Sequence, residues 1–189
     1  AATLRLLERA FFPDGAFESM PASYMAHEIG ADVPYCYRGG TQFVCGIGDV
    51  LAAQEPFPRL PLILVTPPFA VSTKDSFAAL NIESRAPVDE NGAKLMQQYA
   101  EIIKDKNYSE LQTLLKNSFY PYLLDTYPEI KTYCIALKDT GSPFVSLSGS
   151  GPTLFAIYKE DTATKSIARV LKSKFPLADI TESYINGLL

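Results

Sequence analysis

The chain has 189 residues, of which 47% are hydrophobic and 20% charged, a balance typical of folded globular proteins. Its net charge of −4 comes from 17 lysines and arginines against 21 aspartates and glutamates without a basic block, so no nucleic-acid-binding surface is expected. Three cysteines without C-x-x-C spacing and one histidine argue against a disulfide framework, a zinc site and most histidine-based catalytic sets, and they fit a reducing cytosol. No apolar run reaches the roughly 18 residues that a membrane span needs.

The first twelve residues have the pattern of a helix that is already under way. Leu4, Leu7 and Phe11 recur at spacings of three and four, and neither an initiator methionine nor a capping residue precedes them. We therefore expect the chain to be part of a longer protein. The turn residues of Pro13-Asp14-Gly15 are expected to end this helix.

Asp32 is the first candidate for chemistry. It follows a predicted helix over residues 21–29 and its terminating Gly30, and it stands shortly before Pro34. Because proline disfavours the α conformation in the residue before it, this segment is predicted to be extended and rigid. A carboxylate held there can act as general base for a hydroxyl, and the alternative is an ordinary turn or helix-capping aspartate.

The next segment predicts a short strand and then a linker. Gln42–Cys45 is the strand, and it lies between the runs Gly39-Gly40-Thr41 and Gly46-Ile47-Gly48. The second glycine pair is interpreted as hairpin glycines. Residues 53–60 contain two prolines and several polar side chains, so they are the best linker of the chain.

Beyond the linker the pattern predicts an α+β sandwich of antiparallel strands with helices on one face. The order is strand, helices, strand, strand, helix, strand, with a polar loop over residues 82–91. The predicted strands cover residues 62–65, 144–147, 154–158 and 180–185. The predicted helices are a short one through Leu80 capped by Ser72 or Thr73, then 93–103, 109–116 capped by Ser109, 127–138 and 162–174.

A glycine-rich turn, Ser148-Gly149-Ser150-Gly151, joins two of these strands. It lacks the strand-to-helix context of a Walker loop or a dinucleotide fingerprint. Glycine permits close approach of a ligand to backbone N–H groups, and successive N–H groups can form an anion-binding nest. The alternative is a hairpin turn that needs glycine for its geometry alone.

Thr73 and Phe77 are four residues apart, so they share one face of the predicted short helix. The ring can stack on a base, and the hydroxyl can hydrogen-bond to it. The alternatives are core packing for Phe77 and a helix cap for Thr73.

Four motifs together resemble those of the GHMP small-molecule kinases in order and spacing, over nearly the whole chain. They are Ala31-Asp32-Val33-Pro34, Gly39-Gly40-Thr41 with Gly46-Ile47-Gly48-Asp49 beyond it, Val71-Ser72-Thr73, and Ser148-Gly149-Ser150-Gly151-Pro152-Thr153. The resemblance implies that residues 1–57 are the remainder of an N-terminal ATP-binding domain of ribosomal S5-like fold. Residues 58–189 would be the C-terminal domain, a ferredoxin-like α/β sandwich.

Within that family the motifs are most similar to those of the branch that acts on 4-diphosphocytidyl-2-C-methyl-D-erythritol. The resemblance implies ATP-dependent phosphorylation of its 2-hydroxyl in non-mevalonate isoprenoid biosynthesis, with Mg²⁺ on the nucleotide, in the cytoplasm, and without a nucleic-acid or membrane partner. It predicts no metal ligand in this chain and leaves the oligomeric state open.

The same resemblance assigns roles to individual residues. Asp32 would be the catalytic base, Phe77 would stack on the cytosine, and Thr73 would be a nearby polar contact. Gly149, Ser150 and Gly151 would bind substrate as a wall that closes over the active site. Asn117 aligns with the asparagine of a family Asn-Asp-Leu-Glu element. In this chain the element is Asn117-Ser118-Phe119-Tyr120, so only the asparagine is retained, and we assign it no role.

One family feature has no counterpart in these 189 residues. Members carry a lysine and a Gly-rich phosphate loop ahead of a helix that begins like Ala1-Ala2-Thr3. The resemblance therefore implies that this chain alone lacks kinase activity, and its ATP-binding residues stay unknown. Two alternatives remain open: a GHMP kinase for homoserine, mevalonate or a sugar, and a non-catalytic fragment.

Overall fold

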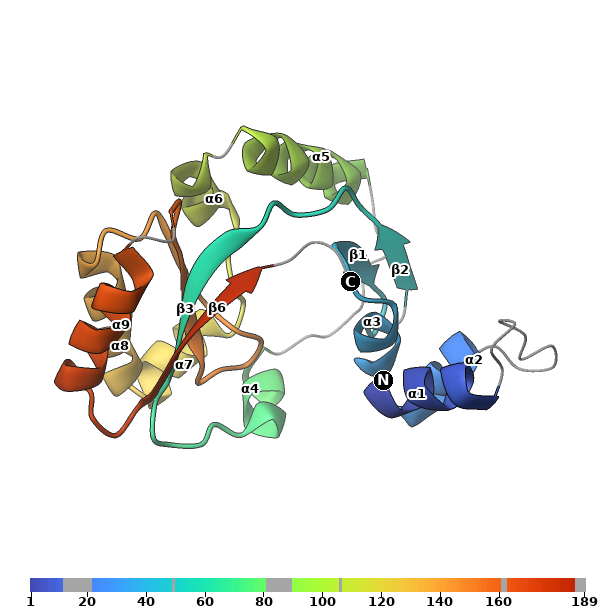
Figure 1. The fold of residues 1–189 in the computed structure, drawn as a ribbon, viewed down its shortest axis with the longest axis horizontal. Helices are drawn as coiled ribbons and strands as arrows, with labels where there is room; N and C mark the ends of the chain where they lie inside the picture. The colour runs from blue at the N-terminus through green and yellow to red at the C-terminus, as the bar shows by residue number, and fades with distance from the viewer. Residues whose placement is uncertain (12–21, 49, 81–89, 106, 161–162, 186–189) are drawn as a thin grey trace. The chain divides into compact units, whose positions relative to one another are not determined.

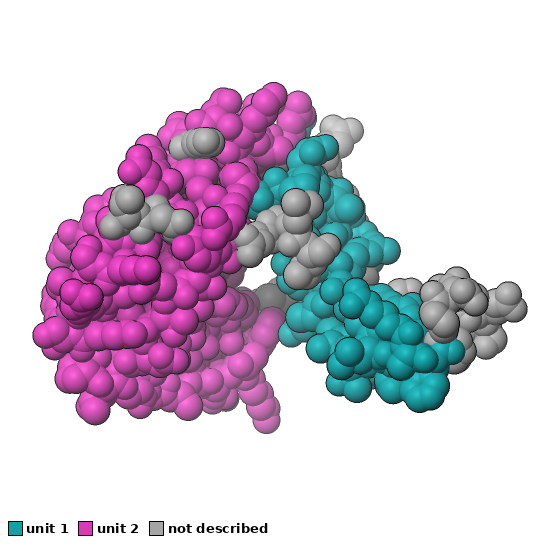
Figure 2. Space-filling model, viewed as in Figure 1, with its two compact units in different colours: residues 1–57, 85–96, 186–189 teal, residues 58–84, 97–185 magenta. Residues whose placement is uncertain are grey.

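The computed structural model describes residues 1–11, 22–48, 50–80, 90–105, 107–160 and 163–185 (Figure 1). The predicted Pro13 turn and most of the predicted 82–91 loop lie outside the described residues. The chain divides into two compact units, which are coloured separately in Figure 2. Unit 1 comprises residues 1–57, 85–96 and 186–189, and unit 2 comprises residues 58–84 and 97–185.

The described part of residues 1–57, which belong to unit 1, forms three short helices and a hairpin. The helices are α1 (Ala2–Phe11), α2 (Ala22–Ile29) and α3 (Val33–Arg38). Strands β1 (Gln42–Cys45) and β2 (Val50–Ala53) pair antiparallel, with Gln42 opposite Ala53 and Cys45 opposite Val50. The strand and its hairpin glycines are confirmed, because Gly46 and Gly48 both have positive φ. The predicted linker over residues 53–60 is too long at both ends, since Ala53 still belongs to β2 and Leu60 already belongs to the next strand, β3 (Leu60–Thr66).

The prediction of an extended segment after Asp32 is wrong. Helix α3 begins at Val33, and Asp32 at its N-cap position has α-region angles (φ −84°, ψ −14°). Pro34 falls in the first turn of the helix, where a backbone N–H has no intrahelical partner and proline costs nothing. The position of the proline within the helix thus outweighs its effect on the preceding residue.

Unit 2 is built on a four-stranded antiparallel sheet, which confirms the α+β class. Its strands are β3 (Leu60–Thr66), β4 (Phe144–Leu147), β5 (Leu154–Ile157) and β6 (Asp179–Ile185), in the order β4-β5-β3-β6. Helix α8 precedes β4, and α9 connects β5 to β6, so these elements follow the β-α-β-β-α-β order of a ferredoxin-like sandwich. The apolar run of β3 is explained by its place between two neighbouring strands.

The helices that follow residue 58 were predicted only in part. The short helix is capped by Ser72, whose Oγ accepts from the Asp75 N–H at 3.2 Å, and not by Thr73. Asn107 rather than Ser109 occupies the N-cap position of α6, and a helix starting at Tyr120 was missed. The observed helices are α4 (Thr73–Ala79), α5 (Glu90–Lys104), α6 (Tyr108–Leu114), α7 (Tyr120–Thr126), α8 (Glu129–Asp139) and α9 (Thr164–Lys174).

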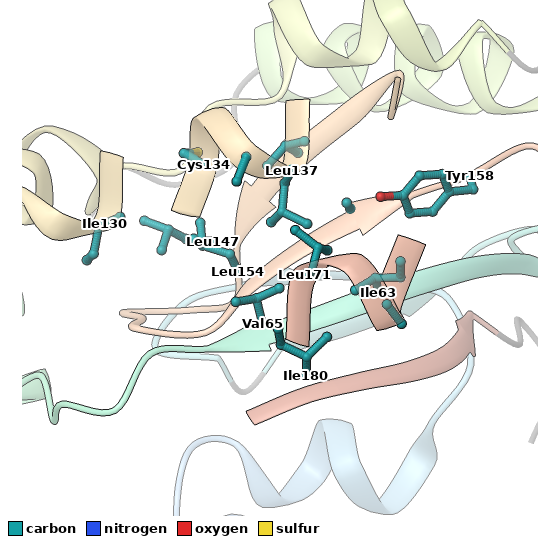
Figure 3. Close-up of a cluster of buried hydrophobic side chains, with 14 of the residues drawn as sticks. Ile63, Val65, Ile130, Cys134, Leu137, Leu147, Leu154, Tyr158, Leu171 and Ile180 are labelled. Atoms are coloured by element: carbon teal, nitrogen blue, oxygen red, sulfur yellow. The ribbon is translucent and has the colours of Figure 1, made fainter. Parts of the chain in front are cut away.

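The core of unit 2 lies between the sheet and helices α8 and α9, as Figure 3 shows. Ile63 and Val65 on β3 face the same side because strand residues two apart share a face. Leu137 of α8 is fully buried and Leu171 of α9 is 2% exposed, so both helices bury an apolar stripe against this face. This packing holds the β4–β5 connection, and with it the glycine-rich turn, at one end of a rigid sheet.

None of the described helices combines the length and the apolar character that a membrane crossing requires.

Candidate functional site

Asp32 lies in unit 1, on the connection between α2 and α3. Its side chain is exposed and makes no capping hydrogen bond to the helix that it precedes, although its carbonyl accepts from the Cys36 N–H at 3.1 Å. The carboxylate is therefore not used for capping, which was the structural alternative for this residue. It is accessible to a ligand.

The hairpin glycines support this connection. A Cβ at Gly48 would lie 3.4 Å from the carbonyl oxygen of Ala31, and the φ of Gly48 is +107°. Glycine at this position thus permits close packing of the β1–β2 turn against the residue beside Asp32. The motif that contains Asp32 thus meets the Gly46-Ile47-Gly48 motif in space.

Arg5 holds the other end of α3. Its Nε donates to the Tyr37 carbonyl at 2.7 Å and its Nη2 to the Arg38 carbonyl at 3.1 Å, so it satisfies carbonyls that the helix end leaves without intrahelical partners. The Tyr37 hydroxyl donates to Glu8 of the same helix as Arg5. Burial, followed by the hydrogen bond and the negative charge of Glu8, raises the pKa of Tyr37.

Replacing Arg5 by alanine is expected to lower the free energy of unfolding by about 1–2 kcal/mol, since charge-assisted hydrogen bonds are lost at a half-buried site. The measurement is the urea midpoint followed by circular dichroism. Arg9→Ala is the matched control, because Arg9 lies exposed one turn further along α1. Equal losses for the two variants would show that the carbonyl contacts of Arg5 contribute nothing measurable.

The glycine-rich turn in unit 2 is closed by its own backbone. The Ser148 N–H donates to the Thr153 carbonyl at 2.9 Å, and the Gly151 N–H donates to the Ser148 carbonyl at 3.0 Å. Gly149 and Gly151 have φ of +57° and +79°, which side chains rarely adopt. Among the described residues, the N–H groups of Gly149 and Ser150 have no acceptor, so these two donors are available to a ligand.

Two hydroxyl groups meet beside these donors. The Oγ1 of Thr73 at the start of α4 lies 3.1 Å from the Oγ of Ser150. The residues are 77 positions apart, and the contact joins the third motif of the sequence to the fourth. A second pair, Thr66 Oγ1 and Thr153 Oγ1 at 3.0 Å, fastens the end of β3 to the far side of the same turn.

Phe77 lies one turn further along α4 and is 55% exposed, so core packing does not explain it. Its ring contacts Phe119 edge-on, with centroids 5.0 Å apart and an interplanar angle of 78°. This contact restrains an exposed ring that can stack on a planar ligand. The structure thus brings Thr73, Phe77 and Ser150 together in unit 2, whereas Asp32 belongs to unit 1.

Asn117 is the residue whose importance the sequence did not indicate. Its Nδ2 donates to the carbonyls of Leu147 at 3.2 Å and Gly149 at 2.9 Å, and its Oδ1 accepts from the Phe119 N–H at 2.9 Å. It also lines a cavity of about 210 Å³ beside β4, together with Lys116 and Lys138. The only signal in the sequence was its alignment with a family asparagine.

In chemical terms, unit 2 offers two backbone N–H donors, two hydroxyl groups and one exposed ring. Backbone donors with positive-φ glycines suit the oxygen atoms of a phosphate, and an exposed ring suits a base. Unit 1 offers an exposed carboxylate, which suits the acceptance of a proton. The groups of unit 2 by themselves suit a ligand that combines a base with phosphates.

Comparison with known proteins gives three findings. Residues 99–177 match the family model described as GHMP kinases C terminal. The chain is 29% identical over 181 residues to a 4-diphosphocytidyl-2-C-methyl-D-erythritol kinase of Clostridium perfringens strain SM101, covering 95% of this chain and 60% of that protein. It is 32% identical over 178 residues to the enzyme of that name from Clostridium tetani, covering 93% of this chain and 60% of the relative.

A solved structure has the same fold. It is a crystal structure of 4-(cytidine 5'-diphospho)-2C-methyl-D-erythritol kinase, which matches with a TM-score of 0.76 and 20% sequence identity. The match covers 98% of this chain and 63% of that chain. The chain thus spans about 60% of the length of the curated relatives reported above.

Proposed function

We propose that the protein containing this chain is an ATP-dependent kinase of a small-molecule alcohol, since residues 99–177 match the family model described as GHMP kinases C terminal. The proposed substrate is 4-diphosphocytidyl-2-C-methyl-D-erythritol, phosphorylated on its 2-hydroxyl in isoprenoid biosynthesis. The names of the relatives support this substrate. The structural observation that carries the proposal is the contact of Thr73 with Ser150, 3.1 Å apart beside the glycine-rich turn.

The glycine-rich turn is proposed to hold phosphate oxygens. The N–H groups of Gly149 and Ser150 donate to them, and the hydroxyl pair of Thr73 and Ser150 adds a further polar contact beside these donors. Gly151 keeps the turn in a conformation that exposes these donors. Backbone donors carry no charge of their own, so they bind phosphate without needing a basic surface, in agreement with the net charge of −4.

Asp32 is proposed as the general base. Its carboxylate accepts the proton of the substrate hydroxyl while that oxygen forms its bond to phosphorus and the bond to the leaving oxygen breaks. Phosphoryl transfer depends mostly on positioning and charge stabilisation, so the hydrogen bond from the hydroxyl to Asp32 also orients the nucleophile. The connection between α2 and α3 supports this role because it leaves the carboxylate without a helix-capping bond.

ATP, when bound, supplies the phosphoryl group, and Mg²⁺ neutralises charge on its phosphates. The turn donors fit a phosphate group. Among the residues that the structure describes, no three His, Cys, Asp or Glu side chains gather as a metal site, so none is assigned to Mg²⁺. The cytoplasm is the proposed compartment, since Cys36, Cys45 and Cys134 are free thiols.

Substrate-dependent consumption of ATP by the protein containing this chain tests the proposal. We expect kcat/KM for the cytidine conjugate to exceed the values for homoserine and mevalonate by about a hundredfold or more, because a site built for hydrogen bonds rejects analogues that lack them. A comparable or higher value with homoserine or mevalonate would transfer the proposal to that alcohol. If none of these three alcohols caused ATP to be consumed, the proposed kinase function would be contradicted.

Phe77→Leu provides a matched variant in the same assay. It keeps an apolar side chain of similar size but removes the aromatic face, and base stacking contributes about 1–3 kcal/mol. The KM for the conjugate should therefore rise about tenfold, while the KM for ATP stays unchanged. Equal changes in both values would place Phe77 outside the binding site for the base.

A further inference from the structure

Asn117 uses its whole amide group in hydrogen bonds. An asparagine side chain has one NH₂ group with two N–H donors and one carbonyl acceptor. Here Nδ2 contacts two carbonyls, those of Leu147 and Gly149, and Oδ1 contacts the N–H of Phe119. The opposite orientation of the amide would place oxygen against two carbonyl oxygens, so the surroundings select this one.

The position of Asn117 explains what these bonds do. Strand β4 lies at one edge of the four-stranded sheet, with β5 on its other side. Its outward-facing backbone groups meet side chains instead of a further strand: Gln112 Oε1 accepts from the Val145 N–H at 2.7 Å, and Asn117 donates to the Leu147 carbonyl. Two amide side chains thus provide hydrogen-bond partners for two backbone groups on this edge of the sheet, which no further strand pairs.

The bond to Gly149 carries this anchor into the glycine-rich turn. Gly149 directly precedes Ser150, whose hydroxyl meets Thr73. In the described part of the chain, three side chains hold the turn by hydrogen bonds: Asn117 at the Gly149 carbonyl, Thr73 at the Ser150 hydroxyl and Thr66 at Thr153. Of these, only Asn117 is bonded to a backbone group of the turn, so it restrains the peptide that precedes Ser150.

The bond to Phe119 connects Asn117 to the aromatic part of the site. Phe119 precedes α7, and its ring contacts Phe77 with centroids 5.0 Å apart. The N–H of Phe119 donates to Asn117 two residues earlier, which fixes the backbone from which this ring projects. One side chain is thus attached both to the turn that offers phosphate donors and to the support of the exposed ring.

We propose that Asn117 is a positioning residue, which holds the glycine-rich turn and the Phe119 support of Phe77 in a fixed relation. Asn117 itself need not contact substrate. The inference rests on the proposed function, because it assigns both parts to one ligand. It implies that loss of the two amide donors misplaces bound phosphate and base together, which raises KM and lowers kcat.

The test is Asn117→Asp in the protein containing this chain. The substitution keeps size and the acceptor for the Phe119 N–H, but it removes both donors and sets a carboxylate against two carbonyl oxygens. Gln98→Glu is the control for the same change of amide to carboxylate, since Gln98 lies exposed on α5, away from the turn and from Phe77. KM and kcat for the cytidine conjugate are measured well below the unfolding temperature.

We expect KM to rise and kcat to fall so that kcat/KM drops about a hundredfold, as misplacement of reacting groups can cause, with the control within twofold. A folded Asn117→Asp protein whose kcat and KM both stay within threefold of the original would overturn the inference. A purely structural role would lower the urea midpoint without changing these constants.

An observation on the unaltered chain keeps the inference testable if Asn117→Asp does not fold or if the kinase activity itself fails. Nuclear Overhauser contacts between the Asn117 side-chain NH₂ protons and the α protons of Gly149 are expected, together with slowed exchange of those NH₂ protons with water. Fast exchange without such contacts would overturn the positioning role. Absence of kinase activity with these contacts present would instead contradict the proposed function and leave the anchor of the turn established.

Discussion

Under the proposed role of Asp32 as general base, we expect its replacement by asparagine to lower the kcat of phosphoryl transfer by about 10²–10⁴-fold, the range that such a group contributes. Asparagine has nearly the same shape and can still accept a hydrogen bond, so substrate orientation is largely preserved. It cannot take up the proton of the hydroxyl at neutral pH. The KM for the alcohol should therefore change much less than kcat.

The local structure indicates that this substitution changes the chemistry of the side chain without disturbing the fold. The Asp32 side chain is exposed and makes no capping bond to α3, so its replacement should leave the urea midpoint nearly unchanged. Asp139→Asn, at the exposed end of α8, is the control for the loss of one negative charge. A fall in kcat of less than about tenfold would rule out the general-base role, whatever the effect on KM.

Replacing Gly151 by alanine is expected to give the largest loss of stability among the turn positions. The φ of Gly151 is +79°, and a Cβ there would lie 3.0 Å from Leu123 Cδ1 and 3.4 Å from Leu147 Cδ2. Both leucines belong to the core, with exposures of 0% and 3%, so neither side chain can move into solvent. The backbone strain of about 1–2 kcal/mol and overpacking of about 1–3 kcal/mol act together.

Gly141→Ala separates these two contributions. Gly141 has a similar φ of +83°, but a Cβ there meets nothing within 4 Å. Its substitution should cost only the backbone strain, so the urea midpoint of Gly151→Ala should lie clearly below that of Gly141→Ala at equal m-values. Equal midpoints would mean that crowding against Leu123 has no energetic effect.

The strands and turns of unit 2 were predictable because their signals are local. The run Leu62–Val65 and the two short apolar runs beside the glycine-rich turn are rich in residues that favour strands. Strands β3 and β4 contain their predicted runs, and β5 ends one residue before the predicted end at 158. Glycines with positive φ were expected in the turns and are found there. These features depend on a few neighbouring residues, so the amino-acid sequence is enough to indicate them.

The predictions of secondary structure failed where the local signals conflict or are weak. Pro34 disfavours helix in the residue before it, yet proline is also well suited to the first turn of a helix, and the second effect decided the conformation after Asp32. Helix α7 was missed because its tyrosines and Pro121 do not form a clear apolar stripe. Its burial of Leu123 under the glycine-rich turn becomes visible only in three dimensions.

The order of the amino acids is enough to indicate the fold class, the order of the motifs and the residue types available for chemistry. Which of these residues meet follows from the packing of the folded chain. The contact of Thr73 with Ser150 joins positions 77 apart, and the bond from Asn117 to Gly149 joins positions 32 apart. Such pairs form only after β3, β4 and β5 have aligned in one sheet, because the packing of the sheet, and not any preference of neighbouring residues, closes loops of that length.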